Sequence, residues 1–335
     1  GHIASTGFCV IRALPQIHHR YIFWFVQTDF FLNPLNQLQR GTNYPAVRDS
    51  DIFSQVIPLP PLPEQHRIVN KIEELFTKLD AGVDALKKIK IQLKRYRQAV
   101  LKNAFEGKLT QQWREAHKEE LEPASVLLEK IKEQRKKESK GKFKELPPID
   151  TSELPELPEG WVWTRLGEIS EKINPGFPSG KHNKESLGVP HLRPMNISIK
   201  GNIDFSDTKY VEETNYEPLL GGDVLFNNTN SPELLGKTSY IKQNTNWAYS
   251  NHMTRIRLNK ELFNPAWIAN VLHHFFLNGF FKMNCVHHVN QASINTSFLA
   301  EKVLIPLPPL PEQHQIVSEI ERRFSVADKL EKIVE

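Results

Sequence analysis

The chain has 335 residues, of which 39% are hydrophobic and 24% are charged. This length suits two domains of about 150 residues each. Because no apolar run reaches the roughly 18–20 residues of a membrane helix and no signal-peptide pattern opens the chain, the sequence predicts a cytoplasmic protein without a membrane partner. The net charge of +4 permits a nucleic-acid partner but does not by itself indicate one.

Residues 1–57 are predicted to form the last part of a globular domain. They combine a strand-like run at 8–11 with an aromatic stretch at 21–26 that fits a buried helix or strand equally well. Three of their positions recur at an offset of 245, namely Ser5, Ile11 and Arg12 as Ser250, Ile256 and Arg257. Because the match covers only the end of the later domain, the first domain is expected to lack roughly 90 N-terminal residues of a full unit.

A proline-rich stretch follows and occurs twice. Residues 58–64 read Pro-Leu-Pro-Pro-Leu-Pro-Glu and recur unchanged at 306–312; between 57–80 and 305–328, 16 of 24 positions are identical. This period is far longer than the roughly 20–50 residues of a solenoid unit, so we interpret it as a module of domain plus helix used twice. The stretches also fit Pro-x-x-Pro ligands, but their place before identical helix starts favours a structural hinge.

A long helix is predicted from Glu64 to about Asn103. Apolar residues recur there at alternating spacings of four and three over about five heptads, which is typical of a coiled-coil seam. Such a helix is about 60 Å long and needs a partner, for which the second copy at 306–335 is the candidate. The predicted seam residues are Ile68, Ile72, Leu75, Leu79, Leu86, Ile89, Leu93, Tyr96, Ile316 and Ile320. The basic residues between Lys87 and Arg97 fit either phosphate contacts or an ordinary solvated face.

The chain between the helices contains a charged segment, a linker and a second domain. A docking helix is predicted over 124–137, and the proline-rich stretch 146–158 marks a boundary. The second domain shows short strand signals and one helical run, which predict an α+β fold; these lie at 189–193, 223–226, 254–258 and 265–281. The predicted division is therefore the end of a first domain at 1–57, the first hinge with the long helix and the charged segment at 58–145, and a proline-rich linker at 146–160. The second domain follows at 161–305, and the second hinge with the start of the second helix at 306–335.

Cysteine and histidine spacings predict neither a metal site nor a disulfide framework. Cys9 and Cys285 are the only cysteines and form no C-x-x-C motif. The pairs His273-His274 and His287-His288 have no acidic or cysteine partner at ligand spacing.

The order of these parts resembles the specificity subunit of a type I restriction-modification system. The resemblance rests on a reader domain, a Pro-Leu-Pro-Pro-Leu-Pro-Glu-Gln hinge, a long helix, a second reader and a second hinge, and it covers essentially the whole chain. The closest matching segments are 93–101, 107–110, 113–114, 157–161 and 219–225 with Gly236-Lys237. The implied fold is α+β, with two globular target-recognition domains, the first partial, joined by long antiparallel coiled-coil helices.

The resemblance also implies a function and partners. Each recognition domain would read one half of a split site in double-stranded DNA, while the helices set the spacing and dock two methyltransferase subunits; restriction subunits join that core. The chain carries no adenine-methylation or Walker-type motif, so it is expected to be non-catalytic. It is expected to hold no cofactor, with S-adenosylmethionine, ATP and Mg on partner subunits only.

Polar loops of the second domain are the predicted DNA contacts. Arg, Asn and Gln suit base edges, whereas Lys and small polar groups hold phosphate. The predicted residues are Arg193, Asn196, Asn227, Asn228, Asn230, Lys237, Asn251 and His252. Ordinary turns use the same residue types, so that interpretation stays open.

Two other function classes remain possible. One is a coiled-coil protein–protein scaffold without sequence-specific DNA binding, whose DNA affinity would lack a steep salt dependence. The other is a stand-alone modification enzyme, which the missing catalytic motifs disfavour.

Overall fold

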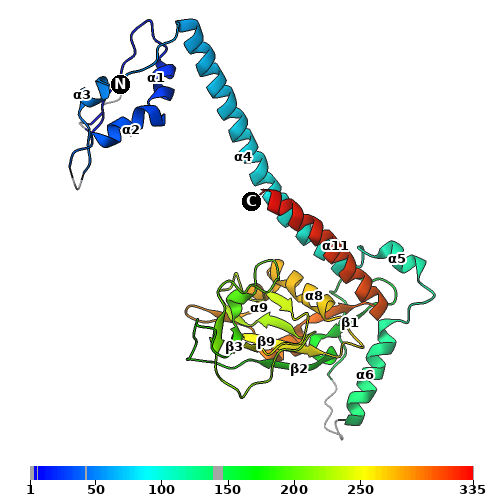
Figure 1. Cartoon of the computed structure of the whole chain (residues 1–335). Coiled ribbons are helices and arrows are strands. Elements are labelled where there is room, and N and C mark those ends of the chain that lie inside the picture. The colour runs from blue at the N-terminus through cyan, green and yellow to red at the C-terminus, as the bar shows by residue number, and fades with distance from the viewer. Residues whose placement is uncertain (1–3, 6, 42–43, 139–145, 335) are drawn as a thin grey trace. The chain divides into compact units, whose positions relative to one another are not determined.

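The computed structural model describes residues 4–5, 7–41, 44–138 and 146–334. Its contacts divide the chain into a first unit, 1–90, and a second unit, 91–335. The division lies inside the long helix α4 (Leu62–Phe105), which confirms the helix predicted from Glu64 to about Asn103. The helix α4 continues from one unit into the other without a break (Figure 1).

The first unit contains three short helices beside the first half of α4. They are α1 (His19–Phe25), α2 (Asp29–Gln37) and α3 (Asp49–Phe53). The Tyr21 hydroxyl donates to the Pro58 carbonyl at 2.6 Å, and the Trp24 ring stacks on Phe76 of α4 with centroids 4.9 Å apart. The aromatic stretch is therefore a helix that anchors the start of α4.

One strand prediction in the first unit is wrong. Residues 8–11 form no strand, and both Phe8 and Val10 are exposed. A single extended segment cannot satisfy its backbone groups without a neighbour, and the described part of this unit offers it no partner strand.

The second unit is a mixed α+β domain. Its strands are β1 (Val162–Arg165), β2 (Ser170–Pro175), β3 (Val189–Leu192), β4 (Lys209–Val211), β5 (Val224–Asn227), β6 (Thr229–Asn230), β7 (Thr238–Tyr240), β8 (Ala248–Tyr249), β9 (Met253–Leu258), β10 (Val286–His287), β11 (Ala292–Ser293) and β12 (Leu304–Leu307). Its helices, besides the end of α4, are α5 (Gln111–Ala116), α6 (Ala124–Glu138), α7 (Leu166–Ile169), the 3-10 turn η1 (Pro194–Asn196), α8 (Pro265–Leu277), α9 (Phe280–Asn284), α10 (Thr296–Lys302) and α11 (Leu310–Val334). The strands predicted around β3, β5 and β9 are confirmed.

A four-stranded sheet in the order β2-β9-β5-β7 forms the centre of this unit. Side chains alternate across it: Val224 and Phe226 of β5 belong to the core under α8, whereas Leu225 belongs to a second core. That second core lies against the β4-β3-β8 sheet and includes Leu192 and Tyr249. Because both faces are buried, β5 is a continuous apolar run and not an alternating one.

The helical run predicted over 265–281 is split into α8 and α9. Gly279 lies between them with φ of 76°, a left-handed conformation that glycine adopts without strain. The turn redirects the chain so that Phe281 packs against Phe226 with ring centroids 4.8 Å apart.

Within the second unit the end of α4 packs against α11. The Arg97 guanidinium donates to Asp328 at 2.6 Å and to Glu331 at 3.1 Å, and it lies 5.3 Å from the centre of the Phe324 ring. Glu312, at the other end of α11, contacts Arg114 beyond the end of α4. The two helices are therefore antiparallel over this stretch (Figure 1).

The predicted seam has two environments. Leu93, Ile316 and Ile320 are buried, and Val100 joins them in the core. In the first unit Ile68 and Ile72 are half-buried, whereas four further seam residues are exposed, namely Leu75, Leu79, Leu86 and Ile89; Tyr96 is also exposed. A coiled coil along the whole of α4 thus stays a proposal.

The helix predicted within the charged segment is α6, and it contributes to the domain core, whereas the sequence predicted a docking appendage outside the core. Helix α6 buries Ala124, Leu128 and Ile131. Of the apolar stripe that the sequence predicts at Val126, Leu127 and Ile131, only Ile131 is buried, and the other two residues are half-buried. None of the helices in the described ranges is both long and apolar enough to cross a membrane.

Candidate nucleic-acid interface

Four chain segments meet at one end of the second unit. They are residues 176–188, 192–197, 227–237 and 249–252. Backbone hydrogen bonds link them in sequence: Ser250 N donates to Leu192 O at 2.9 Å, Asn251 N to Phe177 O at 3.2 Å, and Asn228 N to His252 O at 3.1 Å. The structure therefore brings all three predicted loops together and adds a fourth.

The fourth segment, 176–188, begins with a glycine that the packing requires. A Cβ atom on Gly176 would lie 1.9 Å from the Tyr249 carbonyl oxygen, far inside van der Waals contact. Phe177, the next residue, bridges to Ser250 in a parallel arrangement. Any larger residue at Gly176 would push this loop away from the other three.

Two predicted DNA-contacting asparagines hold the loops together. Asn228 is buried; its side-chain amide donates to Asn251 O at 3.1 Å and to the Thr254 hydroxyl at 2.8 Å. Asn227 is also buried and its amide donates to Leu234 O at 2.9 Å. In this conformation neither side chain reaches solvent, so the structure gives both a scaffolding position.

Lys237 and Asn196 are internal in the same way. The Lys237 ammonium donates to the Pro194 carbonyl at 2.9 Å and to the Ile197 carbonyl, and burial lowers its pKa. The Asn196 amide accepts from Arg193 N at 2.9 Å and donates to an Asp204 carbonyl at 2.8 Å. Both side chains therefore hold the η1 turn.

The remaining predicted residues differ in accessibility. Asn251 is exposed, while Asn230 and His252 are half-buried. The Arg193 side chain is 16% exposed and donates to the Asp207 carbonyl at 2.9 Å. Asn230, Asn251 and His252 are thus the predicted residues that a ligand meets first.

The sequence reading missed two accessible polar segments. Lys181 and Lys184 are exposed on 176–188, and a hairpin formed by β10 and β11 carries the exposed run 286–291. The hairpin is joined to the site because β11 pairs with β6 and Ile294 N donates to Asn228 O at 2.9 Å. In the sequence, this hairpin is signalled only by His287, His288, Asn290 and Gln291 between Cys285 and Ala292.

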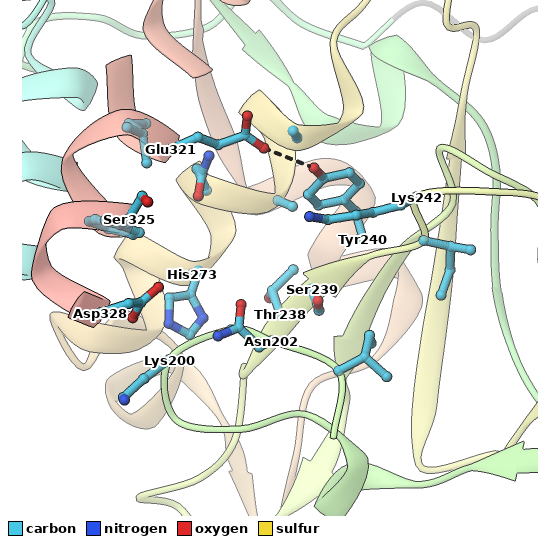
Figure 2. A pocket seen from close by; sticks show the side chains of 18 of the residues that line it. Lys200, Asn202, Thr238, Ser239, Tyr240, Lys242, His273, Glu321, Ser325 and Asp328 are labelled. Atoms are coloured by element: carbon cyan, nitrogen blue, oxygen red, sulfur yellow. Dashed lines mark hydrogen bonds between the residues drawn. The ribbon is translucent and has the colours of Figure 1, made fainter. Parts of the chain in front are cut away.

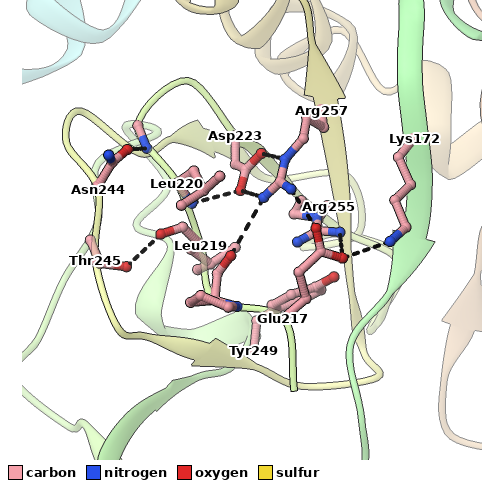
Figure 3. A network of polar contacts seen from close by, with 12 residues as sticks. Lys172, Glu217, Leu219, Leu220, Asp223, Asn244, Thr245, Tyr249, Arg255 and Arg257 are labelled. Carbon is pink, nitrogen blue, oxygen red and sulfur yellow. Dashed lines mark hydrogen bonds and ion pairs between the residues drawn. The ribbon is translucent and has the colours of Figure 1, made fainter. Parts of the chain in front are cut away.

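The two arginines of β9 form ion pairs inside the domain (Figure 3). Arg257 holds Asp223 through two bonds of 2.7 Å. Arg255 is completely buried and donates to Glu217 at 2.6 Å, and Lys172 bonds the same carboxylate at 2.6 Å. Hydrogen bonds from Arg255 and Lys172 lower the pKa of Glu217 to about 2. This network fastens the 216–220 segment to the sheet and leaves neither arginine for base contacts.

A cavity of about 800 Å³ lies elsewhere in the second unit, where the sheet and α8 face α11 and the end of α4 (Figure 2). The Tyr240 hydroxyl donates to Glu321 at 3.3 Å and Lys200 pairs with Glu331 at 2.7 Å across it. The cavity lies between the domain and the helices α11 and α4, away from the four loop segments.

No group of three or more His, Cys, Asp and Glu side chains within the described ranges could hold a metal ion. Cys9 and Cys285 are free thiols, each half-buried.

Comparison with known proteins identifies one family. The model described as "Type I restriction modification DNA specificity domain" matches residues 1–95 and 158–333. The chain is 29% identical over 340 residues to the EcoKI specificity subunit of Escherichia coli K12, covering 98% of this chain and 63% of that protein. It is 35% identical over 171 residues to a putative MjaX specificity subunit of Methanocaldococcus jannaschii, covering 49% of this chain and 40% of that protein. The chain thus spans less than two thirds of both relatives.

Two solved structures share the fold. The HsdS subunit of Thermoanaerobacter tengcongensis aligns with a TM-score of 0.60 and 25% identity, over 99% of this chain and 69% of that one. A chain from a study of complex assembly and conformational transition of the type I R-M system aligns with a TM-score of 0.57 and 26% identity, over 98% of this chain and 70% of that one.

Proposed function

This chain belongs to the type I restriction modification DNA specificity family, and from that membership we propose that it recognises a DNA sequence as the non-catalytic subunit of a larger complex. The observation that supports this best is the meeting of four polar segments at one end of the second unit, tied together by backbone and asparagine hydrogen bonds. A rigid frame that presents loops is the arrangement in which base contacts gain specificity.

We assign the accessible residues of this surface by their chemistry. Asn251, Asn230 and His252 offer donors and acceptors to base edges, and exposed Lys181 and Lys184 offer charges to phosphates. The predicted residues that are buried hold these loops in place; they are Asn196, Asn227, Asn228 and Lys237. Base contacts and phosphate contacts then come from separate segments of one surface.

The wider proposal concerns the whole protein and its partners. The first unit supplies a second recognition surface, the two units read the halves of a split site, and α4 and α11 set the spacing and dock two methyltransferase subunits. Restriction subunits join that core. S-adenosylmethionine, ATP and Mg belong to the partner subunits, since the sequence has no motif for binding or using them.

Selection from a randomised duplex library at about 150 mM salt, with and without the cognate methyltransferase subunit, tests this function. Enrichment of one short motif supports a single reading surface, and a split motif supports two. If no sequence is enriched under either condition, DNA recognition by this chain is refuted.

A scaffold function is the second candidate, and one observation favours it. The exposed row of Leu75, Leu79 and Leu86 on α4 is apolar over several turns, as expected of a surface that binds another helix. A scaffold alone would bind partner subunits while showing no sequence preference on DNA, so the same selection separates the two functions.

A further inference from the structure

The β10–β11 hairpin is an exposed element beside the four loop segments of the second unit. Val286 pairs with Ser293 and His287 with Ala292, and residues 288–291 form the tip. His288, Asn290 and Gln291 are exposed, and Val289 is 99% exposed. The described structure buries none of the tip residues, in contrast to the asparagines and lysine that hold the neighbouring loops.

The hairpin is anchored on its framework. β11 also pairs with β6, so that hairpin and β6 form a three-stranded sheet. Asn228, the residue that joins the loops, accepts a hydrogen bond from Ile294 N immediately after β11. The His288 ring lies 3.0 Å from the Ser293 hydroxyl, which orients it along the hairpin. A protruding tip on a fixed base can enter a groove without folding first.

The chemistry of the tip suits the reading of bases. A two-stranded ribbon fits the major groove of B-DNA, where Asn and Gln can bond adenine through two atoms. The segment 285–295 itself contains no Asp or Glu. Lys282 lies just before the hairpin, where it pairs with Glu233 at 3.3 Å.

We propose that the tip at 288–291 enters a groove of double-stranded DNA, with Asn290 and Gln291 as specificity-determining residues. This inference rests on the proposed function and assigns it to particular residues.

The test uses the full chain with its cognate methyltransferase subunit. The double variant Asn290→Ala/Gln291→Ala is compared with the original chain for affinity to the selected duplex and to a scrambled duplex, at about 150 mM salt. We expect the preference for the selected duplex to fall by about 10-fold or more, because a bidentate amide–base pair contributes roughly 1–3 kcal/mol of discrimination. Affinity for the scrambled duplex is expected to stay unchanged.

A matched control is Gln243→Ala, which removes an exposed amide from the loop between β7 and β8. It is expected to keep the full preference, and thermal melts verify that both variants are folded. The variant Asn290→Asp, which keeps the size of the side chain, is expected to change the preferred base at one position of the site.

The outcomes separate the two levels of the proposal. If the double variant and Asn290→Asp select the same motif as the original chain, with the same preference, the hairpin assignment is wrong while DNA recognition stands. If the original chain itself enriches no motif, the proposed function fails and the hairpin assignment fails with it.

Discussion

The Arg114 guanidinium lies 2.6 Å from a carboxylate oxygen of Glu312, a residue that is completely buried. The same oxygen accepts from the Thr110 hydroxyl at 2.8 Å, and the other accepts from the Trp161 indole at 2.8 Å. Glu312 begins α11 in the second hinge, so these donors tie the hinge to the end of α4 and to the start of the second recognition domain.

Glu312→Gln is expected to destabilise the second unit strongly. The amide nitrogen would face donors that now meet a carboxylate oxygen, and breaking a buried ion pair costs about 3–5 kcal/mol. Urea unfolding, followed by circular dichroism, measures the change in midpoint.

The sequence repeat offers a matched control for this variant. Glu64 occupies the same place in the first hinge, where its side chain is 42% exposed and pairs with Arg67 one turn away. Glu64→Gln is expected to change the unfolding free energy by less than about 1 kcal/mol. If the two substitutions changed the unfolding free energy equally, the buried contacts of Glu312 would add nothing to the stability beyond the exposed pair of Glu64.

This pair also shows how far the sequence predicts the fold. Proline stretches and heptad spacing depend on local chain properties, so the starts of α4 and α11 were predictable from the repeat. The environments of Glu64 and Glu312 were not, because Thr110, Arg114 and Trp161 are distant in sequence from the hinge. The strand predicted at 8–11 failed for a related reason, since a strand requires a partner that spacing alone does not reveal.

At the candidate site the sequence located the loops better than the contacting side chains. Polar residues at strand ends pointed to 193–196, 227–231 and 249–252, which do meet. However, an Asn can satisfy a neighbouring backbone as readily as it meets a base, and Asn228 and Lys237 are occupied in that way. The exposed hairpin at 286–293 was missed because its short strands have little periodic signal.

The exposed part of the α4 seam is expected to contribute to partner binding and not to the stability of the isolated chain. Leu79 is 58% exposed, so Leu79→Glu should change the unfolding free energy by no more than about 0.5 kcal/mol. It should weaken binding to the cognate methyltransferase subunit, measured by titration calorimetry, because it places a charge in an apolar contact.

Two further variants define this seam experiment. Leu93→Glu, at a buried position of the same seam, is expected to destabilise the second unit by several kcal/mol, on the order of 3 or more. Lys88→Glu, exposed and off the seam, is expected to leave partner affinity nearly unchanged. Unaltered partner affinity in Leu79→Glu would argue against docking at this row.

His273 is expected to make the fold sensitive to acid. Burial lowers its pKa from 6.5 to about 4, with His274 and Lys237 adding to the effect, and its Nε2 lies 3.1 Å from the Ile199 carbonyl. Below pH 6.5 the His273 ring is protonated in the unfolded chain, whereas in the folded chain it stays neutral down to about pH 4. The contribution of neutral His273 to the unfolding free energy is therefore complete above pH 6.5. It is lost as the pH drops from 6.5 to 4, by up to roughly 3 kcal/mol.

His273→Gln tests that pH dependence, since its amide can still donate to Ile199 but does not titrate. The slope of unfolding free energy against pH between 6.5 and 4.5 should become shallower, with His191 and His274, whose pKa values burial lowers to about 4, still contributing. An unchanged slope in His273→Gln would exclude this residue as a source of acid sensitivity.

Lys237 distinguishes a structural lysine from one that binds phosphate. Its ammonium is buried against the Pro194 and Ile197 carbonyls, so Lys237→Met leaves two acceptors unpaired and should cost about 2 kcal/mol of stability. The slope of log affinity for DNA against log salt should stay the same, because no released counterion depends on Lys237. Lys181→Met, on the exposed 176–188 loop, should do the opposite: stability is kept, and the slope becomes shallower by about 0.9 for one lost phosphate contact. A shallower slope in a folded Lys237→Met variant would mean that the loop opens on DNA and that this lysine leaves its carbonyl partners for a phosphate.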